Sequence, residues 1–487
     1  MNFRQARVRL VQVGAVFAAA VLVAGCGNNY RPVVTPVNPS GPPAQPESLA
    51  VVVTAPSPTT PGITTVIDYA GDSILATASI GPGPTAFTLD ETGYNGFTVN
   101  SDHTITNIPV SSTLQTKNVT YSTLSSTAEP LNLFSPSSGL WATDLYGNYA
   151  DVFTGGPATF LIAIPLLPTP VMVMGPGLRG TRYFALSQNI ASPTGLECNN
   201  SPTTQPLGAV TPIEVSSYTT DTPIPTGMCP VYAVESADGA RLFVINRGSD
   251  TITVVNAQFG TLDACTPFLN QAGKTVTCHP TLPLSTSAGL AQDANNDVPA
   301  VAGPVYAEYN AARNLLVVAD YTGNTISVID VSLDEYGNDS ATFGTTYTIK
   351  VGQNPASVTV LLDGSRAYTA NQTDQTVTIA DLTSYTVEKT LAVSGYPRTV
   401  VSTQNSSYGK VYVGSPNSNF LTILRTDQDI VDTTVLLQGD IVDVRVTTQN
   451  GSSGNNNNVS RVPGYGQPCN LPGAASLASL TACQKQP

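Results

Sequence analysis

The segment PASVTVLLDGSRAYTANQTDQTVTIAD, from Pro355 to Asp381, decides the fold. It holds three short runs, PASVTVL, RAYTAN and QTVTIAD, whose β-branched and aromatic residues are typical of strands. Asp363 and Gly364 separate the first two runs, and this pair favours the tight turn of a β-hairpin. A fourth run, VEKTLAVSG, occupies residues 387–395. The segment therefore predicts a small antiparallel sheet of four strands.

Two near copies of this unit precede it. One is PVYAEYNAARNLLVVADYTGNTISVID, which opens at Pro304, and the other is PVYAVESADGARLFVINRGSDTITVVN, which opens at Pro230. In all three copies an apolar residue lies 22 positions after the opening proline: Ile252, Ile326 and Val377. A fixed internal offset that recurs three times indicates a repeat architecture.

The count of repeats predicts the number of sheets. Seven complete units open near Pro84, Pro130, Pro170, Pro230, Pro304, Pro355 and Pro397. The chain also begins with later strands of a unit, at residues 48–53 and 63–81, and ends with an opening strand, DIVDVRVT, at residues 440–447. If the opening strand pairs beside residues 48–53, a ring closes and neither edge is left bare. We expect eight blades, seven complete and one composite, with seven blades as the alternative because the early units match less well.

The side-chain pattern explains why such sheets would assemble into a ring. In the third strand of each unit, residues such as Ile252 and Val254 occupy one face, and small or apolar residues such as Thr253 and Val255 occupy the other. A lone sheet would expose one of these faces to water, whereas sheets stacked around an axis cover both. The prediction is an all-β propeller of four-stranded antiparallel blades. A β-sandwich is the second choice, but it does not require one unit repeated seven times.

Several of these strands resemble a known repeat. The tetrapeptides Phe-Val-Ile-Asn (243–246), Val-Val-Ala-Asp (317–320) and Tyr-Thr-Ala-Asn (368–371), each followed by a turn and a T-x-S/T-V-I-D-like strand, resemble the YVTN β-propeller repeat, which is WD-like. The resemblance covers residues 230–447 best. It implies an exported propeller, and relatives of this fold include lactonases, quinoprotein dehydrogenase subunits and surface-layer proteins. Fold similarity alone does not choose among them.

The first residues predict export. Arg4, Arg7 and Arg9 precede an apolar run at residues 10–23, which is short for a membrane span and typical of a signal peptide. The run ends in Val-Ala-Gly-Cys, which resembles the lipobox of bacterial lipoproteins, and that family implies a lipid on Cys26. We expect a signal peptide (1–25), a Pro/Asn-rich tether (26–47), the propeller (48–447) and a low-complexity tail (448–487). The predicted location is the cell envelope, anchored to a membrane by lipid, and the outer membrane or cell surface if the cell is Gram-negative.

The net charge excludes one class of partner, and the number of cysteines indicates disulfides. The formal net charge is −13, so the chain repels phosphate backbones and nucleic acid is not expected as a partner. Six cysteines besides Cys26 are an even number, as expected of disulfides in an exported chain. Local pairing, in which each disulfide closes one insertion or the tail, is the simplest of the 15 pairings. The candidates are Cys198 with Cys229, Cys265 with Cys278, and Cys469 with Cys483.

Catalytic residue types are scarce. The two histidines, His103 and His279, are interpreted as solvent-exposed turn residues, and they are too few for a three-histidine metal site. The sequence DANND (293–297) has the spacing of half a calcium loop but not the rest of an EF-hand, so weak calcium binding is the only cofactor alternative. Asn256, Asp330 and Asp381 end successive third strands, and this repetition favours turn caps over ligands.

Residues that differ between repeats are better candidates for a site. Tyr232, Glu235, Tyr306, Glu308 and Arg398 fall on innermost strands, where a propeller often binds ligands near its axis. The insertions at residues 188–208 and 257–303 are alternative surfaces for a partner. The first hypothesis is a non-enzymatic, lipid-anchored scaffold that binds an envelope protein or glycan. The alternatives are a lactonase-like hydrolase with a site at the axis, and a non-catalytic subunit of a quinone-dependent dehydrogenase.

Overall fold

A computed structural model describes most of the propeller segment. The described residues are 49–57, 59–110, 119–124, 130–136, 139–145, 147–154, 159–175, 181–190, 206–270, 272–290, 295 and 297–447. The expected signal peptide, Cys26, the tether, Cys198 and the tail with Cys469 and Cys483 lie outside them. Within the described part, no helix is long and apolar enough to cross a membrane.

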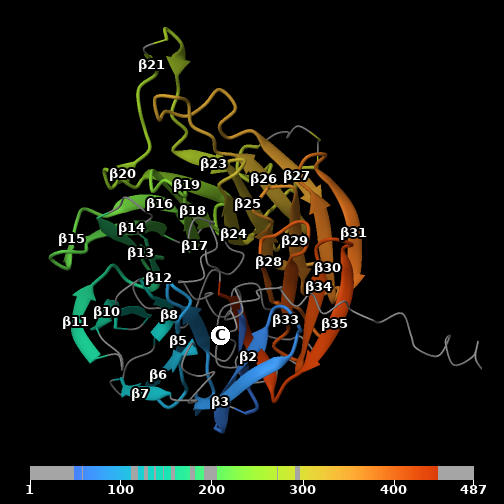
Figure 1. The fold of residues 1–487 in the computed structure, drawn as a ribbon. Helices are drawn as coiled ribbons and strands as arrows, with labels where there is room; N and C mark the ends of the chain where they lie inside the picture. Colours follow the sequence, from blue (N-terminus) through green and yellow to red (C-terminus); the bar gives the residue numbers. More distant parts are fainter. Residues whose placement is uncertain are drawn as a thin grey trace, which may run out of the picture. The chain divides into compact units, whose positions relative to one another are not determined.

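The strands form eight antiparallel four-stranded blades in a ring (Figure 1), which confirms the predicted all-β propeller. From the axis outward, the first four blades are as follows: blade 1, β36 (Asp440–Val446), β1 (Leu49–Ala55), β2 (Pro61–Asp68), β3 (Ile74–Pro82); blade 2, β4 (Ala86–Leu89), β5 (Asn95–Val99), β6 (Thr104–Pro109), β7 (Thr120–Thr123); blade 3, β8 (Pro130–Phe134), β9 (Leu140–Asp144), β10 (Tyr149–Thr154), β11 (Thr159–Pro165); blade 4, β12 (Pro170–Met174), β13 (Arg182–Ser187), β14 (Leu207–Glu214), with β15 (Thr219–Thr220) and β16 (Ile224–Met228) both paired to β14.

The other four blades follow the same order. They are blade 5, β17 (Pro230–Glu235), β18 (Arg241–Asn246), β19 (Thr251–Asn256), with β20 (Thr261–Leu262) and β23 (Thr281–Pro283) both paired to β19; blade 6, β24 (Pro304–Asn310), β25 (Leu315–Asp320), β26 (Thr325–Asp330), β27 (Thr346–Lys350); blade 7, β28 (Pro355–Val360), β29 (Arg366–Asn371), β30 (Thr376–Asp381), β31 (Thr386–Ala392); blade 8, β32 (Thr399–Ser402), β33 (Lys410–Gly414), β34 (Phe420–Arg425), β35 (Ile430–Leu436). The first strands of successive blades touch one another all the way round, so the ring is closed.

Blade 1 closes the ring as predicted. Its innermost strand, β36, comes from the end of the propeller segment and pairs antiparallel with β1 from the start, with Val52 opposite Val444. The backbone N–H of Thr447 donates to the carbonyl of Leu49 at 2.8 Å, and the N–H of Leu49 donates to Oγ1 of Thr447 at the same distance. The observed eight blades, seven complete and one composite, exclude the seven-blade alternative.

The core lies between the blades because both faces of each sheet are covered. On β19, Ile252 and Val254 are fully buried on one face, while Val255 is fully buried on the other. One apolar cluster joins Val254 of blade 5, Ala307 of blade 6 and Val358 of blade 7. No blade could bury these residues alone, so the blades stabilise one another by stacking.

Turn chemistry sets the strand connections. Gly364, in the predicted Asp-Gly turn, and Gly239, in the equivalent turn of blade 5, both have φ near +68°, a conformation that glycine adopts without steric cost. The predicted caps are also confirmed. Asn256 accepts a hydrogen bond from the backbone N–H of Phe259 at 3.2 Å, Asp330 from that of Ser332 at 2.9 Å, and Asp381 from that of Ser384 at 2.8 Å.

A buried amide recurs where the second strand of a blade ends. Nδ2 of Asn371 donates to Oγ1 of Thr376 and of Thr378 on the third strand, at 3.0 and 2.8 Å. Asn100 and Asn246 make the equivalent pair of bonds in blades 2 and 5. The repeat residue that resembles the asparagine of YVTN therefore links the second and third strands of its own blade.

Blade 6 departs from this pattern because Asp320 replaces the asparagine. Its Oδ2 accepts hydrogen bonds from the hydroxyls of Thr325 and Ser327, at 3.1 and 2.7 Å, while Oδ1 is buried without a hydrogen-bond partner among the described residues. Asp320 has no exposed surface. Its burial raises the pKa of Asp320 to about 8, although the hydroxyls of Ser327 and Thr325 act in the opposite direction.

Replacing Asp320 by asparagine is expected to raise the free energy of unfolding, on the order of 2 kcal/mol at pH 8. The folded protein binds a proton that the unfolded chain releases above its pKa, which is near 4. Wild-type stability should therefore fall as the pH rises from about 4 to about 8. Urea unfolding at pH 5 and pH 8 checks this, with the larger gain expected at pH 8. Asn371→Asp is the matched control and should change stability in the opposite direction. A gain independent of pH would rule out ionisation of Asp320 as its cause.

Basic residues tie neighbouring blades together on one side of the ring. We call this side face A; it carries the turns between first and second strands and between third and fourth strands. Arg182, Arg366 and Lys410 each begin a second strand and reach the third-to-fourth turn of the next blade. Their contacts include Arg182 Nη1 with the carbonyl of Gln258 at 3.0 Å, Arg366 Nη1 with that of Thr426 at 2.8 Å and with Asp429, and Lys410 Nζ with that of Tyr69 at 2.7 Å and with Asp72.

Blade 5 has a protruding hairpin instead of a continuous fourth strand. β20 pairs with the end of β19 and β23 pairs with its start. Between them the chain forms the two-stranded hairpin β21 (Phe268–Leu269) and β22 (Thr275–Val276), and β21 lies beyond the rim of the ring in Figure 1. The described part of the predicted insertion at residues 257–303 thus includes a structured projection. Most of the other predicted insertion, residues 191–205, lies outside the described residues.

Candidate functional site

Four of the five axis candidates lie on innermost strands, as predicted, and the fifth directly precedes one, but most of them are buried between blades. The rings of Tyr232 on β17 and Tyr306 on β24 pack with their centroids 4.6 Å apart. Arg398, directly before β32, is 6% exposed, and its carbonyl accepts a hydrogen bond from Ser357 at 2.8 Å. These three residues therefore help to join neighbouring first strands. Their role in ligand binding stays a prediction.

The two glutamates also face neighbouring blades. Oε1 of Glu308, a buried residue, accepts a hydrogen bond from the backbone N–H of Val360 on β28 at 3.1 Å. Glu235 lies at the end of β17, half-buried, close to Gly175 of blade 4. The inner edge of a first strand has no strand partner, so its N–H groups need acceptors. Ser357 performs the same task as Glu308 by accepting from the N–H of Val400 at 3.1 Å.

A second charged group at the axis was not predicted from the sequence. Asp443 and Arg445 on β36 form an ion pair with 2.9 Å between Oδ2 and Nη2, and both are almost fully buried. Oδ1 of Asp443 also accepts a hydrogen bond from Thr399 of blade 8 at 3.0 Å. This pair stabilises the contact between the last complete blade and the composite blade.

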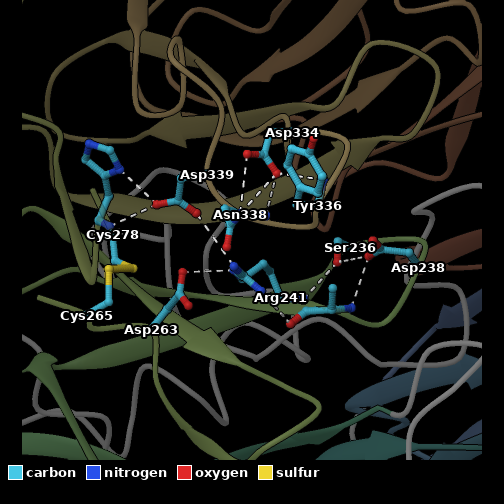
Figure 2. A network of polar contacts seen from close by, with 12 residues as sticks. Ser236, Asp238, Arg241, Asp263, Cys265, Cys278, Asp334, Tyr336, Asn338 and Asp339 are labelled. Atoms are coloured by element: carbon cyan, nitrogen blue, oxygen red, sulfur yellow. Dashed lines mark hydrogen bonds and ion pairs between the residues drawn. A yellow bond between two sulfur atoms is a disulfide. The ribbon is translucent and has the colours of Figure 1, made fainter. Parts of the chain in front are cut away.

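A larger polar network lies at the base of the protruding hairpin (Figure 2). Arg241 is at its centre, at the first position of β18, and is 7% exposed. Its Nε lies 2.9 Å from Oδ2 of Asp263 in blade 5, and its Nη2 lies 3.7 Å from Oδ1 of Asp339 in the loop between β26 and β27 of blade 6. One buried cation therefore faces two buried carboxylates from two blades.

The disulfide and His279 complete the network. Cys265 and Cys278 are bonded with a Cα–Cα distance of 5.5 Å, which confirms this predicted pair. His279 was predicted as a solvent-exposed turn residue, and its side chain is 36% exposed, but its ring also contacts the blade 6 loop. Its Nδ1 lies 2.8 Å from Oδ2 of Asp339, its backbone N–H donates to the same oxygen at 2.9 Å, and its ring stacks on Phe343. The residue that follows the disulfide is thereby fixed to blade 6.

The blade 6 loop has its own internal support. Oδ1 of Asp334 accepts hydrogen bonds from the backbone N–H groups of Tyr336 and Asn338, both at 2.9 Å. Nδ2 of Asn270, near the tip of the hairpin, reaches Oδ2 of Asp334 at 3.4 Å. We call the described residues of 263–279 and 334–343 the hairpin platform. It is held by one disulfide, one ion network and this bond near its tip.

Burial dominates the electrostatics of the network. Burial raises the pKa of Asp263, while Arg241 acts in the opposite direction and Asp339 adds to the rise. Two carboxylates close together in a poorly hydrated place disfavour ionisation of each other unless a cation lies between them. Arg241 supplies that cation, so the network can hold the two loops together at neutral pH.

Apolar side chains are exposed on the hairpin platform. Phe268 is 43% exposed, Leu269 is 68% exposed, and Tyr336 of the blade 6 loop is 43% exposed. Large apolar residues on a fixed projection are a feature of binding sites, because a partner can cover them without first ordering them.

The sequence contains one repeated signal that bears on this network. Arg182, Arg241, Arg366 and Lys410 all precede, by two positions, an aromatic residue of a second strand: Phe184, Phe243, Tyr368 and Tyr412. The repeated basic position could have identified Arg241 as an inter-blade contact. No repeat signal marked Asp263, Asp334 or Asp339, because they lie in insertions of two particular blades.

Other predicted features are only partly described. Cys229 is disulfide-bonded, while its predicted partner Cys198 lies outside the described residues. Of the DANND loop, Asn295 bonds the backbone of Thr348 in both directions, at 2.8 and 3.3 Å. Among the described residues, no group of three or more His, Cys, Asp or Glu side chains is arranged to hold a metal ion. Weak calcium binding stays a prediction, since Asp293 is not described.

Comparison with known proteins supports the fold alone. No family model and no curated protein matches the sequence. Among solved structures, apo AztD from Citrobacter koseri has a TM-score of 0.52 at 11% identity, covering 82% of this chain and 97% of its own. A dihydro-heme d1 dehydrogenase, NirN, reaches 0.57 at 12% identity, with 84% and 77% covered. A putative 6-phosphogluconolactonase from Bacteroides fragilis reaches 0.51 at 14% identity, with 83% and 99% covered.

Proposed function

We propose that this chain is an exported, lipid-anchored propeller of YVTN type that serves as a scaffold and binds a protein of the cell envelope through the hairpin platform. The observation that carries the proposal is the fixed projection itself. Phe268 and Leu269 are presented beyond the rim by a hairpin whose base is closed by a disulfide.

Preorganisation is the physical basis of the proposal. A free loop would lose conformational entropy on binding, at a cost of about 1–2 kcal/mol for each backbone residue that becomes fixed. The Cys265–Cys278 disulfide and the Arg241 network remove most of that cost before any partner arrives. A hairpin that is fixed by a disulfide and an ion network and carries apolar residues at its tip is more consistent with a recognition element than with a simple connection between blades.

The side chains favour a protein over a glycan. Leu269 is aliphatic and is the most exposed of the three apolar residues, and it offers a sugar neither a hydrogen bond nor a flat ring. A leucine with two aromatic neighbours is suited to an apolar pocket in another protein, where a few such anchors supply most of the binding energy. The export and lipid-anchor parts of the proposal are supported by the basic start, the apolar run and the Val-Ala-Gly-Cys sequence.

Capture from solubilised envelopes tests the proposal. The wild-type chain is expected to retain a discrete protein, and Phe268→Ser/Leu269→Ser should weaken binding of that purified protein at least tenfold. The matched control is Phe420→Ser/Leu436→Ser, a cross-strand pair on blade 8 that is 42% and 60% exposed. Cys265→Ser/Cys278→Ser should weaken binding less, because the tip residues remain. Equal binding by both apolar variants would reject the hairpin platform as the site, and a captured glycan would reject the partner class.

A further inference from the structure

The outer strands of four blades carry a bulge at the same place. One extra residue lies between two paired positions near the start of each fourth strand, and it bends the strand. The extra residues are Leu75 in β3, Leu161 in β11, Glu388 in β31 and Asp432 in β35. Because the position is equivalent in all four blades, its side chains can be compared directly.

The residue at the bulge is charged in two of these blades and apolar in the other two. Blades 7 and 8 have a charged residue at the bulge, which is how sheet proteins usually keep an exposed edge from sticking to other surfaces. Blades 1 and 3 have leucines there, 42% and 47% exposed. Charged side chains therefore protect this edge from association in blades 7 and 8, whereas the same edge is apolar in blades 1 and 3.

Further exposed apolar residues extend the part of the rim that lacks charged side chains. Ile74, Tyr121, Phe160 and Ile162 are all exposed on the outer strands of blades 1 to 3. None of these outer strands, β3, β7 and β11, contains a charged residue. In contrast, β27, β31 and β35 include Lys350, Glu388, Lys389 and Asp432. We call the exposed apolar residues of β3, β7 and β11 the apolar rim.

The apolar rim lies on the side where the chain enters the propeller. Leu75, Tyr121 and Leu161 are each within the first three residues of a fourth strand, and fourth strands start at face A. β1 is the second strand of blade 1, and it also starts at face A, at Leu49. Leu49, where the predicted tether meets the propeller, thus lies on the same face of the ring as the rim. In an extended polyproline-type conformation the segment from Cys26 to Leu49 would span about 70 Å.

We propose that the apolar rim rests on the uncharged surface of the lipid bilayer into which the lipid on Cys26 would insert; this step depends on the tethering part of the proposed function. A short tether keeps the propeller at a high local concentration near the bilayer, so a weak apolar contact is sufficient. The rim is convex over three blades. A second copy would be equally convex, so two copies could touch over only about one blade. Lipids can adapt to such a curve. The net charge of −13 favours zwitterionic over anionic lipids.

The test reads the distance of the rim from lipid in the full-length, membrane-extracted protein, reconstituted in phosphatidylcholine vesicles. An environment-sensitive fluorophore is attached to Leu161→Cys or, as the matched control, to Val387→Cys on β31, which is 42% exposed. Brominated acyl chains are expected to quench the label at 161 at least threefold more strongly than the label at 387. Leu75→Glu in the protein labelled at 161 should reduce that quenching to the level of the control.

Two outcomes would contradict the inference. Equal, weak quenching at both positions on vesicle-bound protein would overturn the inference. A label at 161 that is shielded in detergent without vesicles, together with a larger particle mass in sedimentation, would show a protein occupant or a second copy and would also overturn it. Mass spectrometry of the N-terminal peptide reports acylation of Cys26 separately, and the capture assay reads the hairpin platform, so failure of the proposed function is recognised independently.

Discussion

A chain that ends at Gly439 should lose the cooperative fold. It would lack β36, which fills the axial position of blade 1 and pairs with β1 from Ala50 to Ala55. Ile441, Val442, Val444 and Val446 are all at most 6% exposed. Each such side chain contributes roughly 1.5–3 kcal/mol on burial, so the four together match the total stability of about 5–15 kcal/mol that is usual for a domain.

The mechanism of this loss is an opened ring. Without β36, blade 1 has three strands, β1 presents a bare edge to the axis, and Thr399 of blade 8 loses its bond to Asp443. Near- and far-ultraviolet circular dichroism with a thermal scan should show a broad, low transition or aggregation. A chain that ends at Thr447 is the control for removal of the tail and is expected to melt cooperatively.

Rescue in trans makes the prediction specific. A synthetic peptide with the sequence of residues 440–447 is expected to restore a cooperative transition to the chain that ends at Gly439, and a scrambled peptide is not. The reason is that the missing strand is supplied by pairing with β1 and by packing of its own side chains, not by the covalent link. If the shortened chain melted like the wild type without peptide, closure by β36 would not be what holds the ring.

Replacing Arg241 by methionine is the substitution with the next largest expected effect. It leaves Asp263 and Asp339 buried without their cation, and a broken buried ion pair typically costs about 3–5 kcal/mol. The deficit should grow with pH. Burial already raises the pKa of Asp263, and loss of Arg241 raises it further, so the folded state binds a proton that the unfolded chain releases. That part of the stability is lost as the pH rises.

A neutralised network is the control for this prediction. In Arg241→Met/Asp263→Asn/Asp339→Asn no buried charge is left unpaired, and the amide oxygen introduced at position 339 can still accept the bond from the N–H of His279. Urea unfolding is expected to return most of the lost stability and to reduce the pH dependence between pH 5 and pH 8 to that of the wild type. If the triple variant were as unstable as the single one, packing of the arginine side chain would account for the loss instead of charge.

The architecture could be predicted from the sequence because the signals it uses are local and repeated. The Asp-Gly turns, the opening prolines and the alternation of residues such as Ile252 and Thr253 act within one blade. Closure of the ring followed from counting strands. The propeller segment ends with a first strand that has no later strands after it and begins with later strands that have no first strand before them, so the two ends complete one blade. The blade and the closed ring both follow from the rule that sheet edges and apolar faces are covered.

The site could not be predicted in the same way because its contacts join different blades. Arg241 meets Asp339, and Glu308 bonds the N–H of Val360, across loops of variable length that sequence spacing does not fix. Residues expected at an open axis, such as Tyr232, are instead buried between neighbouring first strands, where the ring of Tyr232 packs on that of Tyr306.

The sequence by itself thus determined the four-stranded blade and the seam, whose residues have partners dictated by strand pairing, and it favoured eight blades over seven. Only the tertiary structure decided that the described residues of 268–276 project beyond the ring, which charges meet beneath them and which part of the rim lacks charged residues. The physical reason is that strand pairing follows a fixed period along the chain, whereas contacts between blades depend on how the whole ring packs.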